Sequence, residues 1–116
     1  IRFNGDVPNF ELDKERIFSR LLDLAIKEDI SIEEDFNSRF SVKGENKEDI
    51  KRFFNKNLRS FVNQNDKYHI ESNQNVILVF RYFRVMSVSE VEELVRFGKQ
   101  LTEQFHNCLN NPTDNP

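Results

Sequence analysis

Two histidines and one cysteine are the side chains of this sequence with the widest chemical range. His106 and Cys108 form an H-x-C pair near the C-terminus, which offers two ligands for a metal ion. A stable zinc site uses three or four ligands, and the neighbouring sequence offers no others, so we expect an exposed histidine and an incidental cysteine at a fraying helix end. His69 lies between Tyr68 and Ile70 in a β-rich run, where we expect it to face solvent or a cross-strand neighbour rather than a substrate.

The glycines and nucleophiles show no motif of a familiar enzyme class. Gly5, Gly44 and Gly98 stand far apart, so neither a phosphate-binding P-loop nor a dinucleotide fingerprint can be written. Neither histidine accompanies a G-x-S-x-G nucleophile motif. We therefore assign no catalytic residue, no metal ligand and no cofactor, and the sequence argues against an enzyme without excluding one.

Two charge clusters have possible binding roles. The acidic one contains Glu28, Asp29, Glu33, Glu34 and Asp35. It lacks the residue order of a calcium-binding EF-hand, so a solvated acidic loop is preferred over a calcium site or a carboxylate pair. The basic one contains Lys47, Lys51, Arg52, Lys56 and Arg59. These cations could meet anionic lipid or an acidic partner, but the solvent side of an amphipathic helix is the preferred interpretation.

The composition predicts one soluble, globular domain that is held together by the burial of apolar side chains. The chain has 116 residues, of which 37% are hydrophobic and twelve are Phe, enough for a core. We expect a single domain over residues 1–108 and a disordered tail over 109–116. A net charge of −3 argues against nucleic acid as a partner, and a single cysteine allows no intramolecular disulfide. The frequent Asn, beside Phe, Ile and Lys, hints at an AT-rich bacterial genome.

The apolar pattern predicts an α+β fold, with a small, mostly antiparallel sheet and about three helices. The expected elements are a strand-like start at residues 1–6, a helix at 13–27 capped by Asp13, a strand at 39–44, a helix at 46–62, a central β-hairpin at 67–84 and a helix from Ser87. Ser87 and Glu90 form a capping box for the last helix. Its expected inner face consists of Val91, Leu94, Val95, Gly98, Leu101 and Phe105. The longest apolar run, residues 76–80, is far short of the roughly 20 residues that span a bilayer.

The hairpin carries the most apolar stretch of the chain. A turn at Asn73 and Gln74 would pair Ile70 with Ile77 and would put the helices over one face, made of Tyr68, Ile70, Ile77 and Val79. The opposite face combines His69 and Glu71 with a candidate partner surface of Val76, Leu78, Phe80 and Tyr82. Either a helix of the same chain or a second molecule should cover that surface. Arg81 falls on the helix-facing side, so we expect it near the end of the sheet, where it reaches solvent or an acid.

The segment FNSRFSVKGENKEDIKRFF resembles the Phe-x-Val-x-(Gly/Ser)-x-(Asp/Asn) segment, followed by a helix, of soluble domains from uncharacterised bacterial membrane-anchored proteins. The matching positions are Phe40, Val42, Gly44 and Asn46, and the likeness runs from about Ile32 to Arg84. The resemblance implies a membrane-anchored parent whose transmembrane part precedes Ile1. It brings no catalytic residues.

Two function classes follow from these observations. The first, preferred, is a non-enzymatic interaction or structural domain of a larger bacterial protein, bound to a protein partner or to a second copy of itself. The alternative is a small-ligand-binding or enzymatic domain whose site is scattered along the chain. A pocket lined by convergent ionisable groups would favour the alternative, and an exposed apolar patch would favour the first class. On which side of a membrane such a domain would lie is left open.

Overall fold

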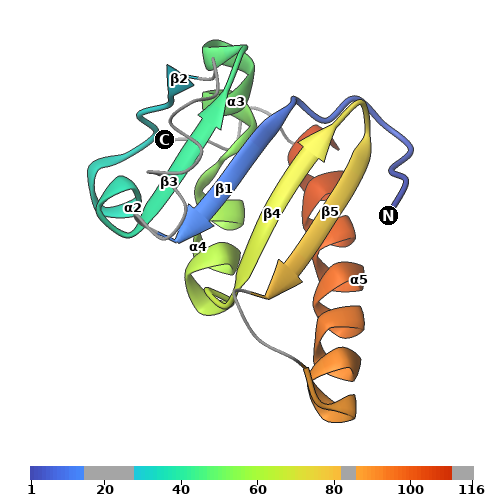
Figure 1. Ribbon diagram of the computed structural model, residues 1–116. Coiled ribbons are helices and arrows are strands. Elements are labelled where there is room, and N and C mark those ends of the chain that lie inside the picture. The colour runs from blue at the N-terminus through green and yellow to red at the C-terminus, as the bar shows by residue number, and fades with distance from the viewer. Residues whose placement is uncertain (15–27, 82–85, 111–116) are drawn as a thin grey trace.

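A five-stranded antiparallel sheet with helices packed against one face forms the fold (Figure 1). The computed structural model describes residues 1–14, 28–81 and 86–110. The strands are β1 (Phe10–Lys14), β2 (Glu28–Asp29), β3 (Phe40–Gly44), β4 (Tyr68–Asn73) and β5 (Val76–Arg81), in the order β2-β3-β1-β4-β5. The helices are α2 (Glu34–Arg39), α3 (Lys47–Phe53), α4 (Lys56–Gln64) and α5 (Val88–Asn110). The predicted α+β class and the central hairpin are confirmed.

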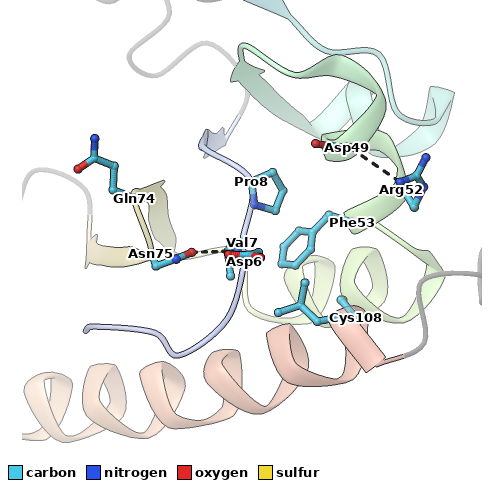
Figure 2. Close-up of a pocket in the computed structure, with 10 residues that line it drawn as sticks. Asp6, Val7, Pro8, Asp49, Arg52, Phe53, Gln74, Asn75 and Cys108 are labelled. Carbon is cyan, nitrogen blue, oxygen red and sulfur yellow. Dashed lines mark hydrogen bonds and ion pairs between the residues drawn. The ribbon is translucent and has the colours of Figure 1, made fainter.

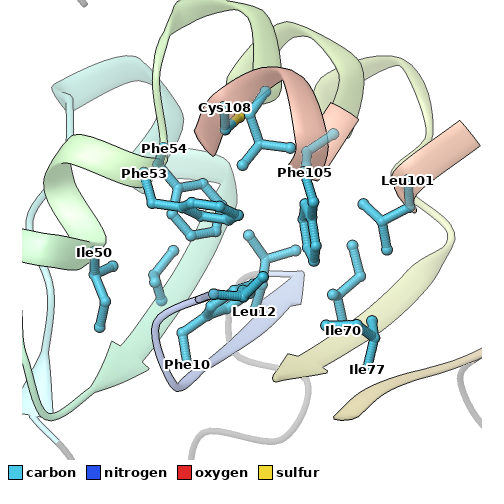
Figure 3. Packing of buried hydrophobic residues seen from close by; sticks show 14 of the residues in the cluster. Phe10, Leu12, Ile50, Phe53, Phe54, Ile70, Ile77, Leu101, Phe105 and Cys108 are labelled. Carbon is cyan, nitrogen blue, oxygen red and sulfur yellow. The ribbon is translucent and has the colours of Figure 1, made fainter. Parts of the chain in front are cut away.

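The core lies between this sheet face and the helices (Figure 3). Alternate residues of the strands point to it, among them Phe10 and Leu12 of β1 and Ile70 of β4. The ring of Phe105 on α5 packs edge to face against that of Phe53, with centroids 5.0 Å apart. Large apolar side chains from each of the described helices thus converge on one layer, which fixes how these helices pack on the sheet.

The helix predicted over residues 46–62 is two helices. Asn46 caps α3 through a side-chain bond from Asp49 N, and Asn55 caps α4 in the same way, accepting from Leu58 N at 2.9 Å. The backbone leaves the helical conformation at Phe54, with ψ of 64°. Both caps are asparagines, whose side-chain oxygens satisfy helix-start amides that would otherwise lack partners. The prediction of one helix overlooked the second cap, because Asn55 lies within a continuous apolar stripe.

The hairpin turn lies one residue later than predicted. Asn73 pairs with Val76, and Gln74 and Asn75 form the turn with φ of 50° and 63°, a conformation that suits two-residue hairpins. Ile70 consequently pairs with Val79 and not with Ile77. The pairing differs from the predicted one by two residues, and a shift of two keeps every side chain on its predicted face.

Three other predicted elements differ from the structure. The N-terminal stretch is an isolated bridge between Arg2 and Val76, supported by backbone hydrogen bonds of Ile1 with Ile77 and of Phe3 with Asn75. Asp13 was predicted to cap a helix, but it belongs to β1, and the rest of the predicted helix lies outside the described residues. The acidic segment, expected to be a loop or an edge segment, contains the edge strand β2 and also the start of α2, where the Glu33 side chain accepts hydrogen bonds from Asp35 N and Phe36 N.

The capping box of α5 is confirmed. Ser87 N donates to Glu90 Oε1 at 3.0 Å, and Glu90 N donates to Ser87 Oγ at 3.2 Å. The helix continues through Asn110, so residues 109 and 110, predicted to belong to the tail, are helical, and residues 111–116 lie outside the described part.

The predicted inner face of α5 is partly wrong. The residues of this helix that are buried are Phe97, Gly98, Leu101, Phe105 and Cys108. Leu94 is half-buried, whereas Val91 and Val95 are exposed. The apolar pattern is wide enough for two faces, and only the position of the sheet decides which one is covered.

Candidate functional site

The sheet face opposite the described helices, here called the outer face, carries most of the charged groups of the strands. In one cross-strand row, Asp13 lies between Ser41 of β3 and His69 of β4. In the next row, Glu11 lies between Lys43 and Glu71. Neighbouring side chains on one face of an antiparallel sheet are close enough to interact. The strands therefore gather one imidazole, one ammonium and three carboxylates on adjacent positions.

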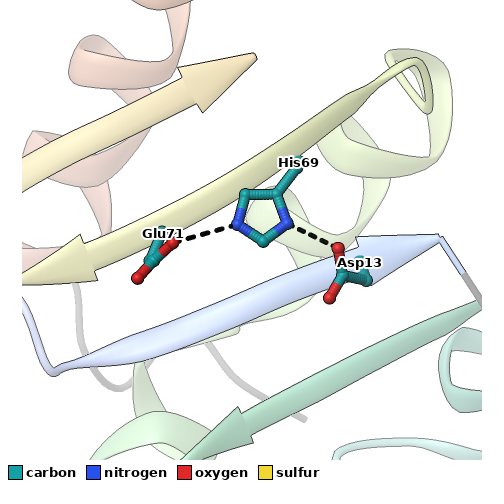
Figure 4. Close-up of polar contacts among 3 residues, drawn as sticks. All are labelled: Asp13, His69 and Glu71. Carbon is teal, nitrogen blue, oxygen red and sulfur yellow. Dashed lines mark hydrogen bonds and ion pairs between the residues drawn. The ribbon is translucent and has the colours of Figure 1, made fainter. Parts of the chain in front are cut away.

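His69 lies between two carboxylates of this face (Figure 4). Its Nδ1 is 2.5 Å from Asp13 Oδ1, and its Nε2 is 3.2 Å from Glu71 Oε2. The ring also stacks on Phe80 of β5, with centroids 4.5 Å apart. His69 is 3% exposed and Asp13 5% exposed. An ionised carboxylate only accepts hydrogen bonds, so both ring nitrogens donate when Asp13 and Glu71 are ionised.

The protonation of His69 follows from these contacts. Burial by itself lowers the pKa of His69, but the hydrogen bonds and charges of Asp13 and Glu71 outweigh it and raise that pKa above 6.5. An imidazolium with both N–H groups engaged has no lone pair to accept a proton. His69 thus ties β4 to β1 and does not serve as a general base in this arrangement. The expectation of a cross-strand partner is confirmed, and the alternative, a solvent-facing ring, is wrong.

The predicted partner surface lies on the same outer face, at the edge strand β5. Val76 is 43% exposed and Leu78 is 51% exposed, while Phe80 is half-buried against His69. Tyr82 lies outside the described residues. The side chains of the outer face are thus buried around β1, whereas Val76 and Leu78 of β5 are exposed to solvent.

A pocket with a volume of about 450 Å³ lies beside the hairpin turn, between the N-terminal segment, α3 and the end of α5 (Figure 2). It is lined by Asp6, Val7, Pro8, Asp49, Arg52, Phe53, Gln74, Asn75, Cys108 and Leu109. Arg52 pairs with Asp49 at 3.8 Å, and both side chains are largely exposed. Asn75 Oδ1 accepts from Val7 N at 3.0 Å, so this amide holds the turn against the N-terminal segment.

Cys108 is buried, contrary to the expected fraying end. Its thiol lies 3.7 Å from Asn55 Oδ1, and burial raises the pKa of Cys108 to about 12. A thiol that stays protonated is a poor nucleophile and a poor metal ligand. His106 instead is exposed and its ring packs at 4.5 Å from that of Phe3. The two residues therefore lie in different surroundings, and the H-x-C pair does not form a bidentate ligand.

The two charge clusters are dispersed by the fold. Asp29 is on β2, near Lys43 at 4.0 Å, while Glu33 caps α2 and the next two acids start that helix. The basic cluster is split between α3 and α4, where Arg59 donates to Phe54 O at 2.7 Å. Within residues 1–14, 28–81 and 86–110, no three His, Cys, Asp or Glu side chains are grouped to hold a metal ion. No helix in these same ranges has the length and apolarity to cross a membrane.

Comparisons with protein-family models, with curated proteins and with solved structures give no match to this chain.

The Asp13–His69–Glu71 cluster was not predicted from the sequence. Asp13 was assigned to a helix cap, and no pattern linked it to a residue that follows 56 positions later. One signal was present, because His69 and Glu71 alternate with Tyr68 and Ile70 and so share a face. Asp13 can be assigned to the cluster only when β1 is known to lie beside β4.

Proposed function

We propose that this domain is a non-enzymatic protein-interaction module of a larger bacterial protein, and that the apolar outer face of β5 is its contact surface. The observation that carries the proposal is the exposure of Val76 and Leu78, two neighbouring apolar side chains on one face of an edge strand. Apolar side chains exposed together at a sheet edge are typical of surfaces that another chain covers.

The chemistry of the reactive groups supports this class over an enzyme. The His69 ring is engaged at both nitrogens, and the pKa of Cys108 is raised to about 12. A ring whose two nitrogens both donate has no lone pair to act as a base, and a thiol that stays protonated is a poor nucleophile. The resemblance of residues 32–84 adds a membrane-anchored parent to the proposal, which the sequence encoded upstream of Ile1 would test.

A photo-crosslinking amino acid in place of Leu78, introduced into the protein in its own cells, tests the contact surface. We expect a discrete crosslinked product. Adding Val76→Glu to the same protein should reduce the amount of this product. The same amino acid at Glu103, an exposed position on α5, is the control. Equal products from positions 78 and 103 would reject the outer face as the contact surface.

The alternative, a small-ligand-binding domain, is supported by the pocket at the N-terminal segment, whose volume of about 450 Å³ is in the usual range for ligand sites. Its ion pair of Arg52 with Asp49 is already balanced without a ligand. A thermal-shift screen with small metabolites decides between the two. A stabilising compound whose effect is lost in Arg52→Ala would favour the alternative, and a screen without any such compound would favour the interaction module.

A further inference from the structure

Asn4 and Gly5 are the only Asn-Gly pair in the sequence. Asn4 is exposed, and both residues lie in a bend between the β-bridge at Arg2 and the buried Val7. In the part of the chain that the structure describes, neither the Asn4 side chain nor the Gly5 N–H forms a hydrogen bond. No hydrogen bond therefore has to break before the Asn4 amide and the Gly5 nitrogen react with each other.

These two groups can close a succinimide ring. When Gly5 N attacks Asn4 Cγ, the bond from Cγ to the side-chain nitrogen breaks, and this nitrogen leaves as ammonia with the proton that Gly5 N loses. Water then adds to one of the two ring carbonyls. Opening at Cγ gives an ordinary aspartate, and opening at the backbone carbonyl gives isoaspartate, in which the main chain runs through the side chain. Glycine favours the ring closure because it has no β-carbon to hinder its nitrogen.

The packing around position 5 requires a glycine. A β-carbon there would lie 2.8 Å from Phe3 Cε1 and 3.0 Å from Leu109 Cδ1. The Phe3 ring is buried and packs edge to face against Phe105, so it has little room to move away. The fold thus keeps beside Asn4 the residue type that hinders succinimide formation least.

We propose that Asn4 is a site of spontaneous deamidation, which releases ammonia and leaves a mixture of aspartate and isoaspartate at this position. The reaction consumes only water, and asparagine is among the thermolabile residues of proteins. Each product adds a negative charge two residues before Asp6, which lines the pocket beside the hairpin turn. The proposal is independent of the contact surface at Val76 and Leu78, because it follows from the reactivity of residues 4 and 5.

Isoaspartate should disturb the N-terminal segment more than aspartate does. Asn75 closes the loop from Phe3 to Val7 at both ends, since its carbonyl accepts from Phe3 N at 2.7 Å and its Oδ1 from Val7 N at 3.0 Å (Figure 2). Phe3 is 4% exposed and Val7 is 6% exposed. Isoaspartate inserts an additional carbon into the main chain of this closed loop. We therefore expect one of the two hydrogen bonds to be strained or lost.

Peptide mapping of the whole chain after incubation in a mildly alkaline buffer tests the site. A single tryptic peptide, residues 3–14, contains both Asn4 and Asn9. Asn9 is the internal control, because Phe10 follows it and its Oδ1 accepts from Gln74 N at 2.9 Å. We expect the deamidated form to accumulate at least about tenfold faster at Asn4 than at Asn9. Equal rates, or an Asn4 that stays unmodified, would overturn the proposal.

A second asparagine separates the effect of structure from that of sequence. Asn37 precedes Ser38, which is also small, but its side chain forms hydrogen bonds with the backbone of residues 30, 32 and 33. Asn37 should therefore stay intact in the folded chain and react faster once the chain is unfolded. If Asn37 reacted as fast as Asn4 in the folded chain, the lack of hydrogen bonds at Asn4 would not explain its reactivity.

Thermal melts test the consequence of the modification. Asn4→Asp adds the charge without the additional main-chain carbon, and it should melt as the wild type does because position 4 is exposed. The isoaspartyl form, separated by chromatography after incubation, should melt at a lower temperature than this control. Asn4→Ser should keep its charge through the same incubation. An isoaspartyl form that melts with Asn4→Asp would refute the strain in the loop, and a charge change in Asn4→Ser as fast as in the wild type would refute the site.

Discussion

The two faces of the sheet are built from alternate residues of the same strands, yet different forces hold them. Toward the helices, Phe10, Leu12 and Ile70 are almost completely buried among aromatic rings. On the outer face, their immediate neighbours Glu11, Asp13 and His69 are also buried, and a hydrogen bond joins Asp13 to His69.

Burial therefore has a different physical basis on the two faces of the sheet. The helix-covered face derives its stability from apolar area, which depends little on pH. The buried part of the outer face depends on specific ionised partners, so its contribution changes with protonation and with single changes of charge. The open part, at Val76 and Leu78, should contribute little to folding and is available for contacts.

The largest effect is expected on the helix-covered face. Phe54→Ala should lower the free energy of unfolding by about 3 to 5 kcal/mol, because it empties a large and fully buried site. Phe54 packs against the rings of Phe10 and Phe36, with centroids 5.0 and 5.9 Å away. Leu94→Ala, at a half-buried position of α5, is the comparison and should cost less than half as much. Denaturant melts measure both, and equal losses would contradict the assignment of the α5 face.

A smaller effect is expected at the buried ion pair. His69→Gln should cost about 2 to 3 kcal/mol, because Asp13 loses a charged hydrogen-bond donor while it stays buried. Glu71→Gln should cost less, since the Glu71 side chain is 30% exposed and its contact with His69 is longer. If chemical denaturation gave the two variants the same stability, the outer face would not be organised around the contact with Asp13.

The outer face should also make stability depend on pH. The pKa of His69 is raised in the folded state by its carboxylate partners against the opposing effect of burial. The folded state therefore holds the proton more tightly, and the stabilisation is fully present below pH 6.5 and is lost as the pH rises through the folded-state pKa. The stability difference between the wild type and His69→Gln should shrink over that range. A difference that grows with pH would show that His69 is neutral in the folded state.

The smallest effect is expected at the open part of the outer face. Leu78→Ser should change the free energy of unfolding by no more than about 0.5 kcal/mol, since half of this side chain is already in water. Thermal and denaturant melts of a dilute sample give the value without any contribution from association. A loss as large as that of His69→Gln would mean that Leu78 belongs to the core and is not a contact residue.

The hairpin shows how far the sequence determines this protein. Strict alternation from Tyr68 to Glu71 and from Val76 to Phe80 was enough to assign every described side chain to its correct face, although the turn was misplaced by one residue. The expected position of Arg81 is confirmed by its ion pairs with Glu90 and Glu93. Such features could be predicted because the period of a strand and the cap of a helix are set by neighbouring residues.

Other features were decided by the tertiary structure alone. Asp13 became a partner of His69, Asn55 divided one apolar stripe into two helices, and Val91 was left exposed on α5. In each case the local sequence was compatible with two outcomes, and contacts between residues far apart in the chain selected one. The sequence by itself determined which residues share a face. Only the order of the strands determined which faces are buried, because the pairing of β1 with β4 brings together groups that no local pattern connects.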